Sequence, residues 1–297
     1  MRDQADRLRQ VIDNLKARQT ADNMDSLHAS GKKAARVIAV TSGKGGVGKT
    51  NIAINIAIAL GELGLRIILL ANVDVLLGIV PKYTLADVIQ NKKNILEVLS
   101  AGPKNIKFLS GGSGVEELLR LEREQLENFM GNVTLLDRIC DIILIDTSAG
   151  LSDYVMSFVM ASDEVLLVTT PEPTSITDAY ALIKIVSKRD RNKVIKVIVN
   201  RADNEDEAYD VLNKLLLVSK KFLKIDLYPL GYILKDESGA RAVKMQQPFS
   251  IAYPKCDAAK RVREISKKLA DIKSDAGIAE NPGIRRFVNR LVGFLSP

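Results

Sequence analysis

The sequence predicts a doubly wound α/β protein with a mostly parallel sheet, and three observations carry this prediction. Short, unbroken apolar runs rich in Val and Ile recur along the chain, which is the pattern of strands buried on both faces. Helical patterns alternate with these runs, and a glycine-rich loop directly follows the first of them. Ligands are therefore expected at the carboxyl ends of the strands.

Five apolar runs are the expected strands. They are "ARVIAV" (35–40), "LRIILL" (65–70), "DIILID" (141–146), "DEVLLVTT" (163–170) and "KVIKVIVN" (193–200). Residues 50–64 form a helical pattern that we expect to end at Gly64, because glycine is favoured just past a helix. Residues 174–188 form another, with Thr174 as the expected N-cap.

Composition narrows the classes of function. The chain has 297 residues, 46% hydrophobic and 27% charged, as soluble globular proteins do, and its charged N-terminus does not resemble a secretory signal, so we expect an intracellular protein. Cys140 and Cys256 are too far apart to suggest a metal cluster, and His28 is the single histidine. Catalysis would therefore use lysines, carboxylates, backbone groups and a bound ion.

Positive charge is concentrated near the C-terminus. Residues 255–297 contain ten Lys or Arg and five Asp or Glu, so this tail carries +5 of the net +7. Such a tail suggests an anionic partner, either nucleic acid or a lipid surface, and a merely solvated helix face is the alternative.

The glycine-rich loop lies in "VTSGKGGVGKTNIA" (40–53) and fits the phosphate-binding pattern G-x-x-x-x-G-K-[ST]. Lys49 is expected on the β and γ phosphates, and the Thr50 hydroxyl on Mg²⁺. Backbone N–H groups at the start of the following helix complete the cradle. The expected nucleotide-contacting residues are Gly43, Lys44, Gly45, Gly46, Val47, Gly48, Lys49, Thr50 and Asn51.

A carboxylate at the end of another strand completes the expected site. In "ILIDTSAG" (143–150), Asp146 follows apolar residues and is expected to hold the magnesium ion or its water shell. Gly150 is then placed to offer its N–H to the γ-phosphate.

The loop "GKGGVGKT" (43–50) resembles the deviant phosphate loop of the MinD and ParA type ATPases. The resemblance implies an ATP-dependent homodimer in which Lys44 reaches the partner subunit's nucleotide and stabilises charge during phosphoryl transfer. Lys44 and Asp146 are therefore the expected catalytic residues.

Longer segments resemble the flagellar MinD-like ATPases of the FlhG (YlxH, FleN) family. These segments include "LLGIVPKYTLADVI", "PEPTSITDAYALIKI", "VNRADNEDEA" and "GYILKDESGARAVKMQQPF". The resemblance implies Mg²⁺ with ATP or ADP, slow dimer-dependent hydrolysis, and control of flagellar number and placement. It places Asn200 and Arg201 beside the adenine, and Asp236 at the start of the loop over the base. It also implies flagellar C-ring proteins and the GTPase FlhF as partners.

One segment departs from the family. The family has an acidic D-x-D pair after the second strand, which positions the attacking water, whereas this chain runs from "LRIILL" straight into "ANVDVLLGI". Asp74 matches a later segment of the family and is no substitute. Either a switch loop is missing between Leu70 and Ala71, which we favour, or the chain cannot hydrolyse ATP.

The N-terminus predicts an amphipathic helix. Its apolar stripe comprises Ala5, Leu8, Val11, Ile12 and Leu15. The stripe could dock on the protein's own core or bind a partner. "DQADRLR" resembles the signature with which the flagellar family activates FlhF, and the implied contacts are Asp3, Gln4, Ala5, Leu8 and Arg9.

The C-terminus predicts a second amphipathic helix, over residues 283–297. Its apolar arc comprises Ile284, Phe287, Val288, Leu291, Val292, Phe294 and Leu295. Arginines on the other side favour an anionic membrane surface over docking on the core. We therefore expect reversible, peripheral association with the inner face of the cell membrane.

The predicted organisation is a partner-activating helix (1–19), a linker (20–34), an ATPase domain (35–272), a linker (273–282) and a membrane-targeting helix (283–297). Four alternatives stay open: a cell-division MinD, a DNA-partitioning ATPase, an iron–sulfur scaffold ATPase and an inactive nucleotide-binding adaptor. The "DQADRLR" helix favours the flagellar interpretation over MinD. The apolar face of the tail disfavours nucleic acid, and the absence of a close cysteine pair disfavours the scaffold.

Overall fold

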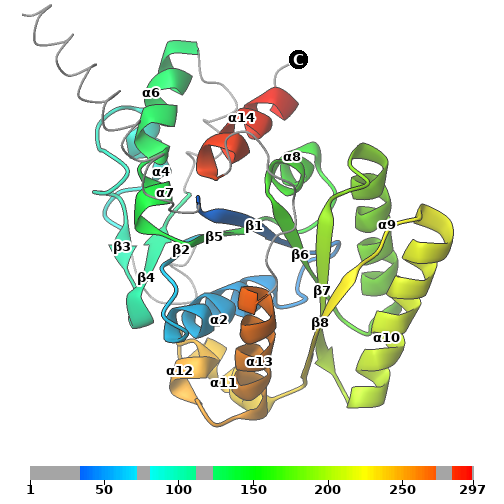
Figure 1. Ribbon diagram of the computed structural model, residues 1–297. Helices are drawn as coiled ribbons and strands as arrows, with labels where there is room; N and C mark the ends of the chain where they lie inside the picture. The colour runs from blue at the N-terminus through cyan, green and yellow to red at the C-terminus, as the bar shows by residue number, and fades with distance from the viewer. Residues whose placement is uncertain (1–33, 72–80, 112–122, 272–282, 296–297) are drawn as a thin grey trace, which may run out of the picture. The chain divides into compact units, whose positions relative to one another are not determined.

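A mostly parallel sheet forms the centre of the computed structural model, which describes residues 34–71, 81–111, 123–271 and 283–295 (Figure 1). Within these ranges the sheet has eight strands in the order β3-β4-β2-β5-β1-β6-β7-β8, and only β3 pairs in an antiparallel way. The strands are β1 (Arg36–Thr41), β2 (Ile67–Leu70), β3 (Ser100–Ala101), β4 (Ile106–Leu109), β5 (Ile142–Asp146), β6 (Glu164–Thr169), β7 (Val194–Ala202) and β8 (Tyr228–Leu234). The predicted fold class is confirmed.

The chain divides into two compact units between Ala34 and Ala35. The first unit lies almost wholly outside the described residues, and so do the predicted contacts of the N-terminal helix. The second unit carries the sheet and is described below.

The five predicted strands correspond to β1, β2, β5, β6 and β7, whereas β3, β4 and β8 are further strands. Strand β4 has only four residues, and β8 contains Pro229 and Gly231, two residues that are depleted in strands. Strand β8 lies at one end of the strand order and pairs only with β7, so it can accommodate such residues.

Helices cover both faces of the sheet (Figure 1). Side chains alternate along β1, so that Ile38 and Val40 face one helical layer while Val37 and Ala39 face the other. The first layer is α2 (Lys49–Glu62), α11 (Glu237–Lys244), α12 (Phe249–Ala252) and α13 (Asp257–Asp271). The second is α4 (Leu85–Ile89), α6 (Arg123–Val133), α7 (Leu136–Ile139), α8 (Asp153–Ala161), α9 (Pro173–Arg189), α10 (Glu205–Val218) and α14 (Ile284–Leu295).

Helix ends follow local chemistry, with one correction to the predictions. Gly64 adopts a left-handed φ of 87° directly after the cap residue of α2, as expected of a helix-terminating glycine. Thr174 is not the N-cap of α9, because the helix begins one residue earlier, at Pro173, with Glu172 as its cap. Proline suits the first helical position, where its missing N–H leaves no bond unmade.

The full sequence has no residues between Leu70 and Ala71, so the expectation of an omitted switch loop is wrong. Leu70 pairs in register with Leu109 of β4 and with Ile145 of β5. The next residue remains in this hydrogen-bonded frame, because Ala71 N donates to Leu109 O at 3.2 Å. The 297-residue sequence therefore goes directly from β2 to Ala71, without the acidic pair that the family resemblance implies.

Helix α14 packs on the protein core, contrary to the expectation that its apolar arc is free for a membrane. Ile284, Phe287, Val288 and Leu291 are each 5% exposed or less. The Phe287 ring lies 5.8 Å from that of Phe158 in α8, centroid to centroid. Val292 is partly buried and Phe294 is 47% exposed, while the side chain of Leu295 lies outside the description. None of the described helices is long and apolar enough to span a membrane.

Polar contacts tie α14 to the core at two aspartates. The Asp137 Oδ1 atom accepts hydrogen bonds from Ala35 N at 3.2 Å and from Ile284 N at 3.1 Å. One carboxylate thus holds both the start of β1 and the start of α14. Asp163 lies 3.8 Å from the Arg286 guanidinium, and burial raises the pKa of both aspartates.

Candidate functional site

The glycine-rich loop connects the end of β1 to the start of α2, as its sequence predicts. Two of its glycines have no room for a side chain. A Cβ atom on Gly43 would lie 2.4 Å from the backbone carbon of Asp178 in α9. Gly48 has a left-handed φ of 87°, and a Cβ there would lie 2.6 Å from Asn200 Nδ2. The loop is therefore held between α9 and the end of β7, and α2 points its N-terminus into the site.

Lys49 and Asp146 form a buried ion pair at the centre of the site. Their side chains are only 10% and 7% exposed. Asp146 ends β5 and is in register with Val40 of the adjacent β1, which explains how residues 97 positions apart come together. Each charge offsets the desolvation of the other. A bound phosphate and a cation would each take one partner from this pair.

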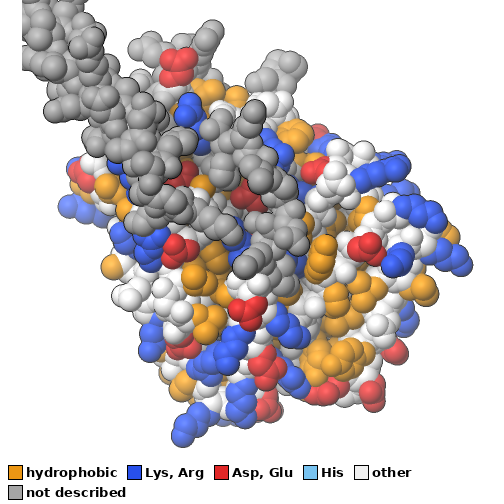
Figure 2. Space-filling view, in the orientation of Figure 1, with side chains coloured by type: hydrophobic (Ala, Val, Ile, Leu, Met, Phe, Trp, Pro, Cys, Tyr) orange, Lys and Arg blue, Asp and Glu red, His pale blue; other side chains and the backbone are white. Residues whose placement is uncertain are grey.

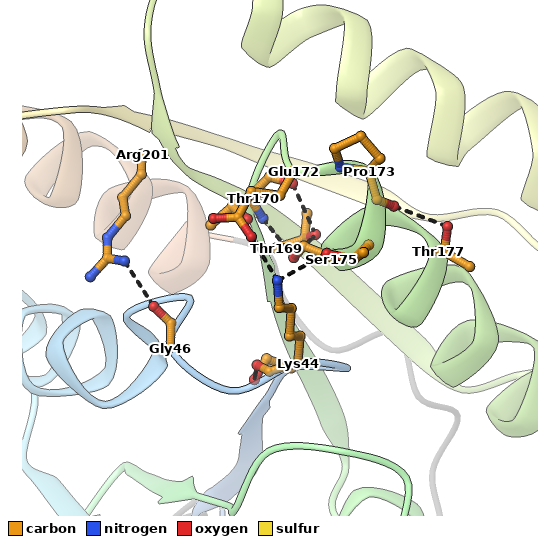
Figure 3. A network of polar contacts seen from close by, with 11 residues as sticks. Lys44, Gly46, Thr169, Thr170, Glu172, Pro173, Ser175, Thr177 and Arg201 are labelled. Carbon is orange, nitrogen blue, oxygen red and sulfur yellow. Dashed lines mark hydrogen bonds and ion pairs between the residues drawn. The ribbon is translucent and has the colours of Figure 1, made fainter.

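Lys44 contacts its own chain. Its Nζ atom donates to Glu172 Oε2 at 2.8 Å and to Thr174 Oγ1 at 2.9 Å, both at the start of α9 (Figure 3). The hydrogen bond from Lys44 lowers the pKa of the Glu172 carboxyl. The Lys44 side chain is 39% exposed, so the ammonium lies at the surface.

Asn200 and Arg201 hold the other side of the loop. Asn200 Nδ2 donates to Val47 O at 2.8 Å, and Arg201 Nη1 donates to Gly46 O at 2.8 Å (Figure 3). Arg201 has a left-handed φ of 59° where β7 ends, which turns its side chain back over the loop. Both residues position the phosphate loop and also border the cavity described next.

A cavity of about 450 Å³ opens beside the loop. Its lining includes five of the predicted nucleotide-contacting residues, namely Gly48, Asn51, Asn200, Arg201 and Asp236. The wall is completed by Ile52, Ile233, Leu234, Lys235, Glu237, Gly239, Ala240, Val243, Phe249 and Ala258. Apolar walls with a few amide and charged groups suit a nucleotide base, so the residues present fit a bound nucleotide.

Asp236 shapes this cavity by capping two helices. Its Oδ1 atom accepts from Ser238 N at 2.8 Å at the start of α11, and its Oδ2 atom accepts from Ala258 N at 3.2 Å in α13. Hydrogen bonds from these N–H groups lower the pKa of Asp236 against the opposing effect of burial. The expected loop residue thus supports the cavity wall.

Not every predicted contact is poised for a ligand. The Gly150 N–H donates to Ser42 O at 2.9 Å, so a γ-phosphate would have to replace that bond.

Asn55, which is fully buried in α2, was not predicted from the sequence as a residue of the site. Its Nδ2 atom donates to Asn51 Oδ1 at 2.8 Å, and its Oδ1 accepts from Ser250 N at 2.9 Å. A polar residue inside the apolar run of α2 was the available signal.

Comparisons with known proteins agree with this geometry. The sequence model of the ParA family, described as "NUBPL iron-transfer P-loop NTPase", matches residues 33–270. The chain belongs to this family of P-loop ATPases. The antiactivator FleN of Pseudomonas aeruginosa is 41% identical over 79% of this chain and 86% of its own length.

Two further relatives extend the likeness. The flagellum site-determining protein YlxH of Helicobacter pylori is 32% identical over 88% of this chain and 90% of its own length. The septum site-determining protein MinD of Pyrococcus horikoshii, solved in complex with Mg-ADP, is 25% identical and covers 83% of this chain and all of its own, with a TM-score of 0.63. The predicted membership of the flagellar MinD-like ATPases is therefore confirmed.

The iron transfer in the family description is not carried over to this chain. Among the described residues, no group of three or more His, Cys, Asp or Glu side chains is placed to hold a metal ion.

Proposed function

We propose that this protein is an ATP-dependent dimerising switch that regulates flagellar number and placement. The observation that carries the proposal is Lys44, a second lysine of the phosphate loop whose ammonium lies at the surface, whereas Lys49 is buried. An exposed cation there can reach the nucleotide of a second subunit. Relatives named FleN and YlxH supply the flagellar context.

In this proposal the nucleotide occupies the loop and the adjacent cavity. Lys49 leaves Asp146 to bind the β and γ phosphates, and the base enters the cavity beside Asn200. Asp146 and the Thr50 hydroxyl hold Mg²⁺, which neutralises phosphate charge when bound. Arg201 keeps the loop closed through Gly46 O.

Hydrolysis is proposed to be slow and dependent on the dimer, because Lys44 acts across the interface. The missing acidic pair after β2 favours a second candidate, a nucleotide-binding adaptor that dimerises without turnover. Phosphate release and sedimentation of the purified chain with Mg-ATP separate the two. Release that disappears in Lys44→Ala supports the enzyme, whereas an ATP-dependent dimer without release supports the adaptor. A chain that stays monomeric with ATP contradicts both.

Membrane association through α14 is proposed to require release of this helix from the core. Release exposes the arc that includes Phe287 and Leu291, and an ATP dimer presents two such helices, so weak single contacts add through avidity. We expect ATP to strengthen binding to anionic vesicles, and we expect this increase to be lost in Phe287→Glu and kept in Asn289→Glu, which adds the same charge to the exposed face. Equally strong binding with ADP and ATP would refute the coupling, and an ATP-dependent increase that survives removal of residues 283–297 would refute α14 as the anchor.

The N-terminal segment is proposed to stimulate the GTPase FlhF, with C-ring proteins as further partners. Asp3 and Gln4 would make polar contacts and Leu8 an apolar one. A peptide of residues 1–19 is expected to raise GTP turnover by FlhF, and a matched peptide with Gln4→Ala and Leu8→Ala is not. Unchanged GTP turnover with the first peptide would contradict this part of the proposal and would leave the proposed nucleotide switch unaffected.

A further inference from the structure

The end of α10 forms an exposed turn that the nucleotide site does not use. Helix α10 continues into η3 (Ser219–Leu223), a single π-helical turn that ends at Lys224 with a left-handed φ of 58°. Ser219 is buried at the base of this turn, whereas Leu217 and Phe222 are 66% and 65% exposed. These are the largest exposed fractions among the large hydrophobic residues that the structure describes.

Lysines surround these two apolar side chains. Residues 214–226 contain Lys214, Lys220, Lys221 and Lys224 against the single acid Asp226, so the segment carries a net charge of +3. All four lysines are exposed. Lys220 pairs with Asp226 at 3.3 Å, and the Lys221 ammonium lies 5.5 Å from the centre of the Phe222 ring. We call Leu217, Phe222 and the four lysines the basic tip.

The basic tip lies at the end of the sheet opposite the nucleotide. Helix α10 starts after the carboxyl end of β7 and runs back along the sheet, so η3 lies towards the amino ends of the strands (Figure 1, yellow). Helix α9, which η3 contacts, ends there with Lys188 and Arg189 exposed. In Figure 2, blue Lys and Arg side chains gather at the upper right, where the end of α10 lies in Figure 1.

Helix α14 lies at the same end of the sheet. Its Arg286 faces Asp163, which directly precedes β6, and Arg290 lies close enough to lower the pKa of Lys193, which directly precedes β7. One flat surface facing the amino ends of the strands could therefore meet both α14 and the basic tip. The tip is exposed while α14 remains docked.

We propose that the basic tip is a contact site for an anionic lipid surface, with Leu217 and Phe222 entering the interface and the lysines facing the headgroups. The two apolar side chains are exposed, and neither lines the cavity beside the phosphate loop or the one beside Tyr209 and Arg261. A lipid surface requires no complementary shape, and long lysine side chains reach headgroups while their stems stay in apolar surroundings.

This contact goes beyond the proposed function because it needs neither ATP nor the release of α14. A single small patch of this kind binds weakly and reversibly. It would bring the resting chain to the membrane, where α14 then adds its own contact. The two sites can be tested separately, since they lie on different elements.

The chain contains no tryptophan, so the fluorescence of one introduced tryptophan reports the surroundings of that position alone. Phe222→Trp is the test variant. Tyr209→Trp, at a residue 50% exposed near the other end of α10, is the matched control, and Phe294→Trp reports on α14. With ADP and vesicles of phosphatidylglycerol and phosphatidylcholine in equal parts, we expect a blue shift of emission and quenching by brominated lipid for Phe222→Trp only. With ATP, Phe294→Trp is expected to join it.

An unchanged spectrum of Phe222→Trp in the presence of anionic vesicles overturns the proposal, whatever Phe294→Trp reports. Insertion of the indole into the vesicle in Phe294→Trp alone would support only the α14 anchor. Insertion in Phe222→Trp alone would support only the basic tip. As a second readout, the double variant Leu217→Ser, Phe222→Ser is expected to weaken vesicle binding with ADP by about tenfold, and Tyr209→Ser is expected to leave it unchanged. Equal binding by both variants also contradicts the proposal.

Discussion

Lys44 Nζ and Glu172 Oε2 lie 2.8 Å apart within one chain, so the lysine proposed to act on a partner subunit is held by its own. The pair is partly exposed, at 39% and 62% of the two side chains, and Thr174 adds a second hydrogen bond to the ammonium. The Lys44 ammonium cannot bind Glu172 and the nucleotide of a second subunit at the same time. Formation of the proposed ATP dimer therefore competes with the Lys44–Glu172 contact. Glu172 thus positions Lys44 in the resting chain.

Glu172→Gln is expected to tighten the ATP dimer by a few-fold, because the freed lysine no longer has to leave a charged partner. Sedimentation with Mg-ATP at several protein concentrations measures this change. Glu97→Gln, which removes the carboxylate from an exposed ion pair with Lys93 in another part of the fold, is the matched control. A weaker dimer in Glu172→Gln would mean that this carboxylate serves the interface itself.

Gly48→Ala is expected to abolish nucleotide binding, because its φ of 87° is strained for alanine and the new Cβ would meet Asn200 Nδ2 at 2.6 Å. Binding of a fluorescent ATP analogue checks this. Gly131→Ala is the control, since nothing lies within 4 Å of a Cβ at that position in α6. The control is expected to bind normally and to unfold at slightly higher temperature, as alanine suits a helix interior. Normal binding by Gly48→Ala would contradict the loop geometry.

Phe287→Ala is expected to lower the free energy of unfolding by about 3 kcal/mol, because it opens a cavity between α14 and α8. Phe294→Ala, on the same helix at a residue 47% exposed, is expected to cost less than about 1 kcal/mol. Chemical denaturation in the absence of lipid gives both values. Equal and small losses would show that α14 does not rest on the core in solution.

Lys193 predicts a pH dependence of stability. Its Nζ atom donates to Met160 O at 2.9 Å and to Ser162 O, at the end of α8. Burial and the neighbouring Arg290 lower its pKa from 10.5 to about 8.

The groups around Lys193 do not all act in one direction. Asp190 and Asp163 raise the pKa of Lys193, whereas Arg286 lowers it. Because the unfolded chain binds the proton more tightly between about pH 8 and 10.5, the free energy of unfolding should rise with pH across that window. The rise is expected to be on the order of 2 kcal/mol.

Urea unfolding at pH 7 and pH 10 tests the Lys193 prediction against Lys193→Met, which lacks the titrating group. Other lysines titrate in both proteins, so the informative quantity is the difference between the two. The wild-type chain should gain stability relative to the variant as the pH rises. An equal change in the free energy of unfolding between pH 7 and pH 10 in both proteins would mean that the Lys193 ammonium is not destabilised by its surroundings.

The parts of the site predicted from sequence are those that depend on local pattern. Lys49 could be placed in the phosphate loop and Asp146 at the end of a strand, because a glycine-rich loop and an apolar run mark these positions in the sequence. The roles of Glu172 and Asn55 could not be predicted, because a hydrogen bond between distant segments leaves no periodic signal. The cavity wall beside Asn200 likewise comes from β8, α11 and α13, which meet only in the folded chain.

The sequence by itself determined the doubly wound sheet and the phosphate loop, since periodicity and glycine spacing are properties of the chain. Only the tertiary structure decided what the apolar arc of α14 faces and which carboxylate holds Lys44. The physical reason is that an amphipathic helix specifies that one face must leave water, and a lysine specifies that it needs an acceptor. The sequence pattern does not specify which partner is used. A core surface and a lipid surface both remove the Phe287 side chain from water, and the hydrophobic effect is the same in the two cases.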